Sequence, residues 1–314
     1  MVQLGIFTLS INIVLPLCIF CLIGYFTRQR HLISGEAYKQ LNKLVFRVLL
    51  PSALCYSTFH SNFRQGFPLK YGLFGSLGVF AVFLIAFIVI AFTHYPKEKK
   101  GVIIQGISRS NFVLLGFPVI QSVYGPHIGA TAILVSFVVP LFNLLSVVVL
   151  EIYSDKEINY LHMVWDICRN PLIIGSVLGI FLNLIHFPMP YIFDRTLSLL
   201  NGATTPLALI ALGGTFQIKA VRTNLMTLVS VILCRLVFVP FVFVGLAIMM
   251  GFRGIELMSL FIAFGSPTAV SSDSMAQEMH GDGELAGQIV FLTTLLSVAS
   301  FFIWISLMEA YHLL

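Results

Sequence analysis

The chain has 314 residues, of which 58% are hydrophobic and only 10% are charged, and its mean hydropathy is +0.96. A soluble domain carries roughly 25% charged residues, so this composition excludes an ordinary soluble protein and predicts an all-α integral membrane protein. The net charge of +5 is not arranged as a basic stripe that alternates with aromatic residues, so we expect no nucleic acid partner.

Apolar segments recur along the whole chain, and ten of them hold roughly the 20 residues that cross a bilayer. The predicted spans are residues 4–26, 39–59, 71–93, 101–122, 128–151, 166–186, 192–216, 224–250, 256–278 and 285–308. Lys and Arg are more frequent in the loops that follow odd-numbered spans. This bias predicts a multi-pass protein of the plasma (inner) membrane, with those loops in the cytoplasm and both termini extracytoplasmic.

Chemical motifs are few in this sequence. Cys18 and Cys21 have the spacing of a redox or metal pair, but they lie at helical spacing inside an apolar span, so we interpret them as packing residues. The sequence holds no phosphate loop, no metal motif and no set of nucleophile, base and orienting group. We therefore expect no enzyme activity, no metal and no cofactor.

Two halves of the chain resemble each other in the order of their helix breaks. A shift of about 155 residues brings Pro51 onto Pro206, and a nearly equal shift brings Asn111 onto Pro267. The match predicts two five-helix repeats, residues 1–152 and 153–314. Because five is odd, the second repeat enters the membrane from the opposite side, which makes an inverted repeat. Pro51 and Pro206 are expected to kink helices that form the wall of a substrate site.

Predicted spans four and nine are each interrupted near the middle, at residues 109–118 and 265–274. A bilayer cannot satisfy free backbone groups, so such helices survive only where they line a cavity or a protein interior. We predict that the half-helices begin after Pro118 and after Pro267 and that their positive ends face each other. Paired discontinuous helices of this kind indicate a transporter's binding site, and their N-termini favour a carboxylate.

The residues around the two breaks are the candidate ligands. A buried arginine in a membrane is costly, and the planar guanidinium of Arg109 can bind a carboxylate with two hydrogen bonds. Alternatively, Arg109 is a structural residue that caps unwound carbonyls. The predicted substrate-binding residues are Arg109, Asn111, Gly116, Pro118, Ser266, Pro267 and Thr268.

Asp273 is the only acidic residue deep in a predicted span. With Ser271 and Ser272 it is a candidate site for a coupling ion, either a proton or sodium, because sodium prefers oxygen ligands. The alternative is a static pair with Arg109 or Arg235. For Arg235 itself, near the middle of predicted span eight, a structural ion pair is the favoured interpretation.

Several motifs, in this order and spacing, resemble those of the auxin efflux carrier family. Arg109-x-Asn111-Phe112-x-x-x-Gly116-x-Pro118 is similar to its fourth-span motif, and residues 205–213 (TPLALIALG) are similar to its seventh-span motif. The similarity continues through the ninth and tenth spans and covers nearly the whole chain. The short central loop is most similar to bacterial members labelled malate permeases.

The resemblance implies a ten-span fold with a scaffold of spans one, two, six and seven and a mobile unit of spans three to five and eight to ten. It also implies organic anion transport by an elevator-like step, commonly as a homodimer in the lipid bilayer. Asp273 departs from the family pattern, in which a neutral residue is expected.

Together these features predict a secondary transporter for a small organic anion, with malate or an auxin-like carboxylate as the leading substrates. Asp273 leaves a cation-coupled exchanger of the sodium/proton antiporter type as the alternative. A membrane sensor is disfavoured because no signalling segment is found, and a channel is distinguished from a carrier by single-channel currents.

Overall fold

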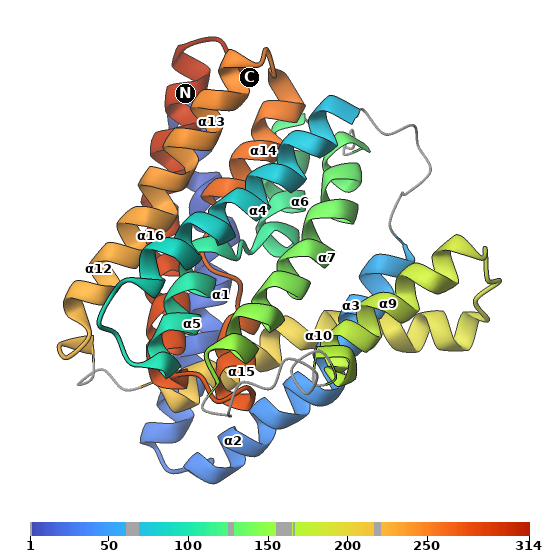
Figure 1. Cartoon of the computed structure of the whole chain (residues 1–314), viewed down its shortest axis with the longest axis vertical. Helices are drawn as coiled ribbons and strands as arrows, with labels where there is room; N and C mark the ends of the chain where they lie inside the picture. Colours follow the sequence, from blue (N-terminus) through green and yellow to red (C-terminus); the bar gives the residue numbers. More distant parts are fainter. Residues whose placement is uncertain (1, 61–68, 125–128, 155–164, 166, 217–220) are drawn as a thin grey trace.

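Apart from one isolated β-bridge, the regular structure in the described part of the chain is helical. The computed structural model describes residues 2–60, 69–124, 129–154, 165, 167–216 and 221–314. The helices of the first half (Figure 1) are α1 (Val2–Gln29), α2 (Gly35–Leu44), η1 (Val45–Leu49), α3 (Leu50–Phe59), α4 (Leu69–Ala91), α5 (Lys97–Ser108), α6 (Phe112–Tyr124) and α7 (Gly129–Ile152). Those of the second half are α9 (Pro171–Leu184), α10 (Tyr191–Thr215), α12 (Leu225–Leu233), η2 (Cys234–Phe238), α13 (Val239–Met249), α14 (Gly254–Gly265), α15 (Ser271–Glu278) and α16 (Gly283–Ala310). The all-helical prediction is confirmed.

Helices cover most of the described residues in each predicted span, except at the breaks in predicted spans four and nine. Within the described residues, five helices are long and apolar enough to cross a membrane, namely Lys70–Ala91, Ala130–Ile152, Tyr191–Thr215, Leu225–Met249 and Gly283–Ala310. The shorter apolar helices include Pro171–Leu184 and Gly254–Gly265. The count of ten spans and their inverted arrangement stay predictions.

Two long helices contain a π-helical turn directly before a proline. The amide of Leu50 bonds to the carbonyl of Val45, and the amide of Val239 bonds to that of Cys234. Pro51 and Pro240 lack an N–H and cannot continue the α-helical ladder, so a wider turn precedes each proline. The second of these turns carries Arg235, a buried residue of the site described below.

The helices pack in two groups. In the first, α1, α2 and α3 pack against α10, and α9 packs against α3. The most extensive of these contacts are those of α1 with α10 and of α3 with α9. In the second, α4, α5 and α7 pack together, as do α13 with α14, α6 with α14, and α12, α15 and α5 with α16. Helix α1 also contacts α16 and α6, and so joins the groups.

Glycines permit the closest approaches in the first group. A Cβ atom at Gly213 of α10 would lie 1.9 Å from the carbonyl oxygen of Cys21 in α1, and one at Gly179 of α9 would lie 2.3 Å from that of Cys55 in α3. No side chain fits at such distances. Small residues therefore bring these helices into backbone contact, as is typical of membrane helix pairs.

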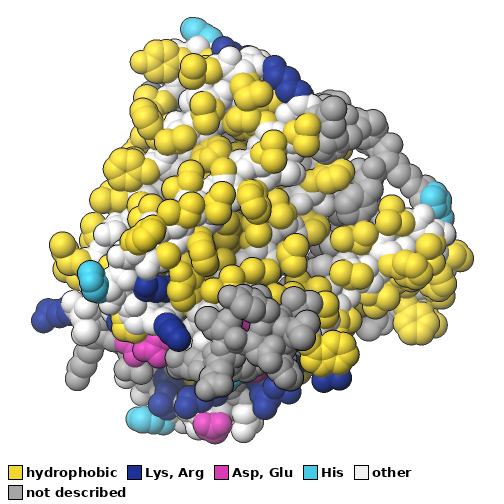
Figure 2. Space-filling view, in the orientation of Figure 1, with side chains coloured by type: hydrophobic (Ala, Val, Ile, Leu, Met, Phe, Trp, Pro, Cys, Tyr) yellow, Lys and Arg dark blue, Asp and Glu magenta, His cyan; other side chains and the backbone are white. Residues whose placement is uncertain are grey.

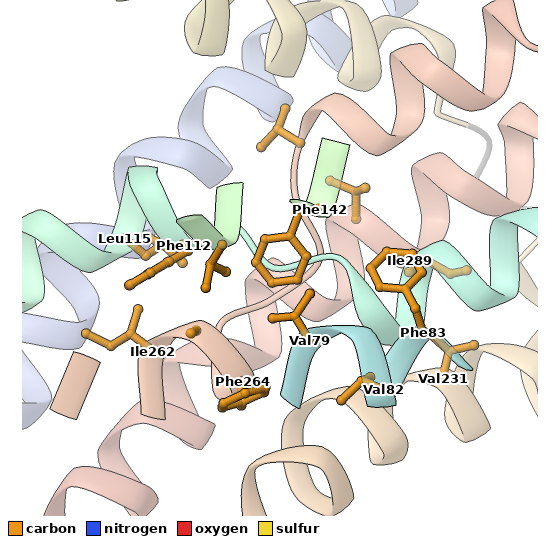
Figure 3. Packing of buried hydrophobic residues seen from close by; sticks show 14 of the residues in the cluster. Val79, Val82, Phe83, Phe112, Leu115, Phe142, Val231, Ile262, Phe264 and Ile289 are labelled. Carbon is orange, nitrogen blue, oxygen red and sulfur yellow. The ribbon is translucent and has the colours of Figure 1, made fainter. Parts of the chain in front are cut away.

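The second group encloses most of the hydrophobic core. Phe112 and Leu115 of α6 lie beside Ile262 of α14, and Phe142 of α7 lies beside Val79 of α4 (Figure 3). The rings of Phe243 and Phe264 stack at 4.5 Å. This packing fixes the two helix breaks, which lie between α5 and α6 and between α14 and α15.

Large apolar side chains also cover the outside of the molecule (Figure 2). Leu77 of α4 is 62% exposed, Phe181 of α9 is 56% exposed and Phe241 of α13 is 68% exposed. Soluble monomers rarely expose apolar surface of this extent, so the surface suits contact with lipid. Most of the Lys and Arg atoms visible in Figure 2 lie at the lower end, where Figure 1 shows α2, whereas both termini lie at the opposite end.

Candidate functional site

The two helix breaks meet and pair through their backbones. The amide of Asn111 donates to the carbonyl of Pro267 over 2.9 Å, and the amide of Ala269 donates to the carbonyl of Arg109 over 3.3 Å. Ser110 and Thr268 form an antiparallel bridge between these two bonds. Each break therefore supplies hydrogen-bond partners that the other has lost. In a membrane the backbone N–H and C=O groups of an interrupted helix must find such partners within the protein.

Side chains at the crossing satisfy further backbone groups. The Thr268 hydroxyl donates to the carbonyl of Gly106 over 2.7 Å, and the Thr268 amide donates to the hydroxyl of Thr293 over 3.2 Å. The Ser110 hydroxyl donates to the carbonyl of Ile262 over 3.2 Å. These bonds tie α5, α14 and α16 to the crossing.

Arg235 caps the carbonyl ends of both interrupted helices. Its Nε donates to the carbonyl of Ser266 over 2.7 Å, and its Nη1 donates to the carbonyls of Ile107 and Ser108 over 3.1 and 3.3 Å. The last carbonyls of a helix have no intrahelical partner and carry the negative end of its dipole, so a guanidinium suits both ends at once. The expected ion pair of Arg235 is wrong, because its recorded partners are backbone carbonyls of α5 and α14.

A cavity of about 510 Å³ opens beside the crossing. Both breaks contribute to its wall, together with the first turn of α6 and residues of α7, and the rest of the wall comes from α1, α3 and α10. Its polar lining residues are Ser57, Arg109, Ser110, Asn111, Asn143, Asn201, Thr204, Thr205 and Ser271. Its apolar lining includes Leu17, Phe20, Leu54, Phe112, Phe142 and Pro206. A pocket of this size accommodates a small organic molecule.

Among the described residues that line this cavity, Arg109 is the only charged one, and it is 4% exposed. Its Nη2 donates to Oδ1 of Asn143 over 2.7 Å, and its Nη1 contacts the sulfur of Met275. Within the described residues, no carboxylate pairs with it. A guanidinium has five N–H donors, so Arg109 retains donors for a further acceptor.

Further donors belong to other residues that line the same cavity. The buried Nδ2 atoms of Asn111 and Asn143 have no hydrogen-bond partner among the described residues. Residues Phe112, Val113 and Leu114 line the cavity with the first turn of α6, whose N–H groups lack intrahelical acceptors. A cavity with a buried cation, free amide donors and a helix N-terminus is chemically suited to an anion, and most of all to a carboxylate.

The predicted site residues separate into three sets. Arg109, Asn111, Ser271 and Pro206 line the cavity. Ser266, Pro267 and Thr268 lie at the crossing but do not line the cavity, and through their backbone groups or side chains they hold the break together. Neither Gly116, which faces Phe112 and Ile262, nor Pro51, whose backbone packs on Gly175, contributes to the wall.

The predicted start of a half-helix after Pro118 is wrong. Pro118 lies inside α6, which begins at Phe112, and its side chain lies outside the described part of the structure. The break falls at Arg109–Asn111 because there the backbone finds partners in the second break and in Arg235. The second break, Ser266–Val270, includes Pro267 as predicted.

Sequence reasoning did not identify Asn143 or the polar residues of α10 that line the cavity, such as Asn201 and Thr204. Asn143 is the polar residue in the run Pro140-Leu-Phe-Asn143 of the apolar helix α7. A polar side chain in such a helix needs an internal partner, and this signal points to Asn143 without any structure.

Asp273 lies in α15 and is 1% exposed. Its Oδ1 accepts a hydrogen bond from Nε2 of Gln277 over 2.9 Å, and its Oδ2 has no partner among the described residues. The static pair with Arg109 or Arg235 is not formed, since no ion pair joins Asp273 to either arginine within the described residues. Asp273 and Ser272 do not line the cavity, although Ser271 does.

The described residues contain no group of three or more His, Cys, Asp or Glu side chains that could hold a metal ion. Cys18 and Cys21 are buried thiols within α1, in agreement with their interpretation as packing residues.

Residues 9–305 match the sequence model of a family described as membrane transport protein. The chain belongs to this family, which is that of the auxin efflux carriers. It is therefore a multi-pass membrane transporter.

An uncharacterised transporter of Methanocaldococcus jannaschii is 24% identical over 94% of this chain and 98% of its own length. A second uncharacterised transporter, from Methanothermobacter thermautotrophicus, is 24% identical over 95% of this chain and 98% of its own length. The uncharacterised transporter YfdV of Escherichia coli is 23% identical over 66% of this chain and 68% of its own length.

Proposed function

We propose that this auxin efflux carrier family member is a secondary transporter of small organic anions, such as malate or an auxin-like carboxylate. One observation supports this proposal above all: Arg109 is buried beside the cavity, and no carboxylate among the described residues pairs with it. Asn111 and Asn143, which line the same cavity, have unpaired amide donors. A buried charge is costly unless it is paired, and a substrate carboxylate supplies the missing partner. The apolar wall of Leu17, Phe20 and Phe142 accepts the carbon skeleton.

The transport step is proposed to be of the elevator type. Helices α1, α2, α3, α9 and α10 form the scaffold, and the remaining helices carry the crossing. The cavity lies between these units, since its walls come from α1, α3 and α10 on one side and from the crossing and α7 on the other. Movement of the crossing along the scaffold then exposes the substrate to alternate sides.

The arrangement of the whole chain is proposed to be ten spans in two inverted five-helix repeats. The antiparallel pairing of Ser110 with Thr268 supports it, because corresponding breaks of two inverted repeats approach each other in opposite directions. The concentration of Lys and Arg at the α2 end supports a plasma membrane protein with that end in the cytoplasm and both termini outside. A homodimer in the bilayer is the proposed assembly.

The experiment is uptake of radiolabelled malate, lactate and indole-3-acetate by liposomes that contain the purified protein. Uptake above that of empty liposomes, saturable and competed by unlabelled acid, is the expected result. Absence of carboxylate uptake under every imposed ion gradient contradicts the proposal.

A cation-coupled exchanger of the sodium/proton type is the second candidate, and the buried Asp273 is the observation that favours it. Exchange of sodium for protons in liposomes without any organic acid distinguishes it from the first candidate.

A further inference from the structure

A second cavity, of about 850 Å³, lies on the α2 side of the crossing, and we call it the vestibule. Its walls come from α1, α2, α10, α15 and α16, and its lining residues include Arg28, His31, Glu36, Lys39, Gln277 and Gly287. It shares no lining residue with the 510 Å³ cavity. On α10 the cavity wall reaches Ala208 and the vestibule wall begins at Leu212, so about one helical turn separates them.

Asp273 lies between the two compartments along α15. Ser271, two residues before it, lines the cavity, whereas Gln277, four residues after it, lines the vestibule. The Asp273 carboxyl contacts two parts of the vestibule wall: Gln277 donates to its Oδ1, and a Cβ atom at Gly287 would lie 3.2 Å from the same oxygen. The carboxyl is therefore one layer of side chains away from the vestibule.

The carboxyl of Asp273 has no cationic partner within the described structure. Arg109 bonds to Asn143 and contacts Met275, and Arg47 of η1 pairs with Glu278 at 3.8 Å. The elements packed against α15 are α2, α5, α10, α16 and η1. Among the described residues, the titratable or charged groups that line the vestibule are Arg28, His31, Glu36, Lys39 and Glu284, and those that pair with or contact residues of α15 are Arg109, Arg47 and, on α15 itself, Glu278.

A buried carboxylate without a cationic partner is costly, and the cost falls when the group takes up a cation. A proton requires a single oxygen, and Oδ2 is free. Sodium requires several oxygen ligands, whereas the recorded neighbour of Oδ1 is the N–H donor of Gln277. The geometry therefore favours a proton.

The position of Asp273 also links it to the anion. It is the third residue of α15, whose first residue, Ser271, lines the cavity. A negative charge at Asp273 opposes a second negative charge near the same helix end, and neutralising Asp273 removes this repulsion.

We propose that Asp273 is a proton-binding site reached through the vestibule, and that a proton at Asp273 and an organic anion in the cavity each favour the binding of the other. The inference rests on the proposed function, because it requires an anion in the cavity. A hydronium ion in the vestibule gives up a proton and becomes water, and the proton passes the intervening layer of side chains and forms an O–H bond at the Asp273 carboxyl. Release of the proton reverses this step after the anion has left.

The test measures equilibrium binding of the three radiolabelled acids to the purified full-length protein as a function of pH, in potassium buffer and in sodium buffer. Affinity is expected to fall with rising pH, by up to about tenfold per pH unit for one linked proton. Asp273→Asn should bind the acid at a pH-independent affinity close to that of the wild type at low pH. Asp273→Glu should restore the pH dependence, and the vestibule variant Glu284→Gln, which is the matched carboxyl control, should keep it.

The outcomes separate the two proposals. If no acid binds to folded wild-type protein at any pH, the proposed function fails and this inference fails with it. If an acid binds but its pH dependence persists in Asp273→Asn, the inference is overturned and the proposed function stands. A dependence on sodium at constant pH that Asp273→Asn abolishes also overturns it, because sodium then occupies the site.

Discussion

The amide of Asn111 and the carbonyl of Pro267 are joined over 2.9 Å, although 156 positions separate them in the chain. This bond places the first turn of α6 beside Arg109 and brings the start of α15 to the same cavity. The anion-binding character of the site thus comes from the pairing of two breaks, neither of which forms the site alone.

Arg109 should dominate the affinity for a carboxylate. Arg109→Gln removes the cation and is expected to weaken binding of the acid at least about 30-fold, which corresponds to about 2 kcal/mol. Arg109→Lys should recover part of the affinity, because a point charge replaces the planar fork. Titration of labelled acid into the purified variants measures this. Arg195→Gln, an exposed arginine of α10, is the control, and equal losses for Arg109→Gln and Arg195→Gln contradict the site.

Arg235 should act on stability through the helix ends that it caps. Arg235→Met leaves buried carbonyls of α5 and α14 without donors, at about 1–3 kcal/mol for a buried unsatisfied group, so the melting temperature should fall by about 5 °C or more. Arg235→Lys should be intermediate, since one ammonium group cannot reach all of these carbonyls. Thermal unfolding in detergent measures the effect, and a Lys variant as stable as the wild type shows that the shared cap is unnecessary.

Gly213 should tolerate no side chain. In Gly213→Ala the new methyl group meets the Cys21 carbonyl, so α1 and α10 must separate and the protein should lose about 1–3 kcal/mol. The matched control is Gly245→Ala in α13, where a Cβ atom meets nothing within 4 Å. Because alanine is the better helix former by about 0.5–1 kcal/mol, the control should be neutral or stabilised in the same melting experiment. Equal melting temperatures for the two variants would show that this contact can relax.

The hydrogen bond between Ser274 and Asn42, over 2.5 Å, joins α15 to α2 and hence the two units of the proposed elevator. A disulfide between Cys residues introduced at these positions, in a variant whose native cysteines are replaced, should stop uptake into liposomes while binding of the acid persists. Reduction should restore uptake.

The control for this disulfide is a second engineered pair at Thr131 and Ser259, whose hydroxyls lie 2.7 Å apart within one unit. Its oxidation should leave uptake intact. Continued transport by the oxidised Asn42–Ser274 pair would argue against relative movement of these helices.

The sequence was sufficient to predict the helices and the existence of both breaks, because apolar length and local Pro and Gly content are encoded within each segment. It was not sufficient for the position of the first break. Pro118 is the local signal, yet the helix breaks at Arg109–Asn111. There the backbone segment between α14 and α15, together with Arg235, supplies the hydrogen-bond partners. Such a position depends on tertiary contacts that no local pattern contains.

The role of each buried arginine also depends on tertiary contacts. Sequence identified Arg109 and Arg235 as costly intramembrane cations, but it could not distinguish the one that caps carbonyls from the one that retains free donors. The difference arises from neighbours in other helices, namely Asn143 for Arg109 and the ends of α5 and α14 for Arg235.

The paired breaks also have a consequence for biogenesis. Ribosomal synthesis releases Arg109–Asn111 long before Pro267–Ala269, so the first break enters the bilayer while its future partners are still untranslated. Until then its amide and carbonyl groups need other hydrogen-bond partners, such as water, a lipid headgroup or an insertase. The backbone of the first break thus stays unpaired in the nascent first half, and only the last third of the chain, once synthesised, supplies its partners.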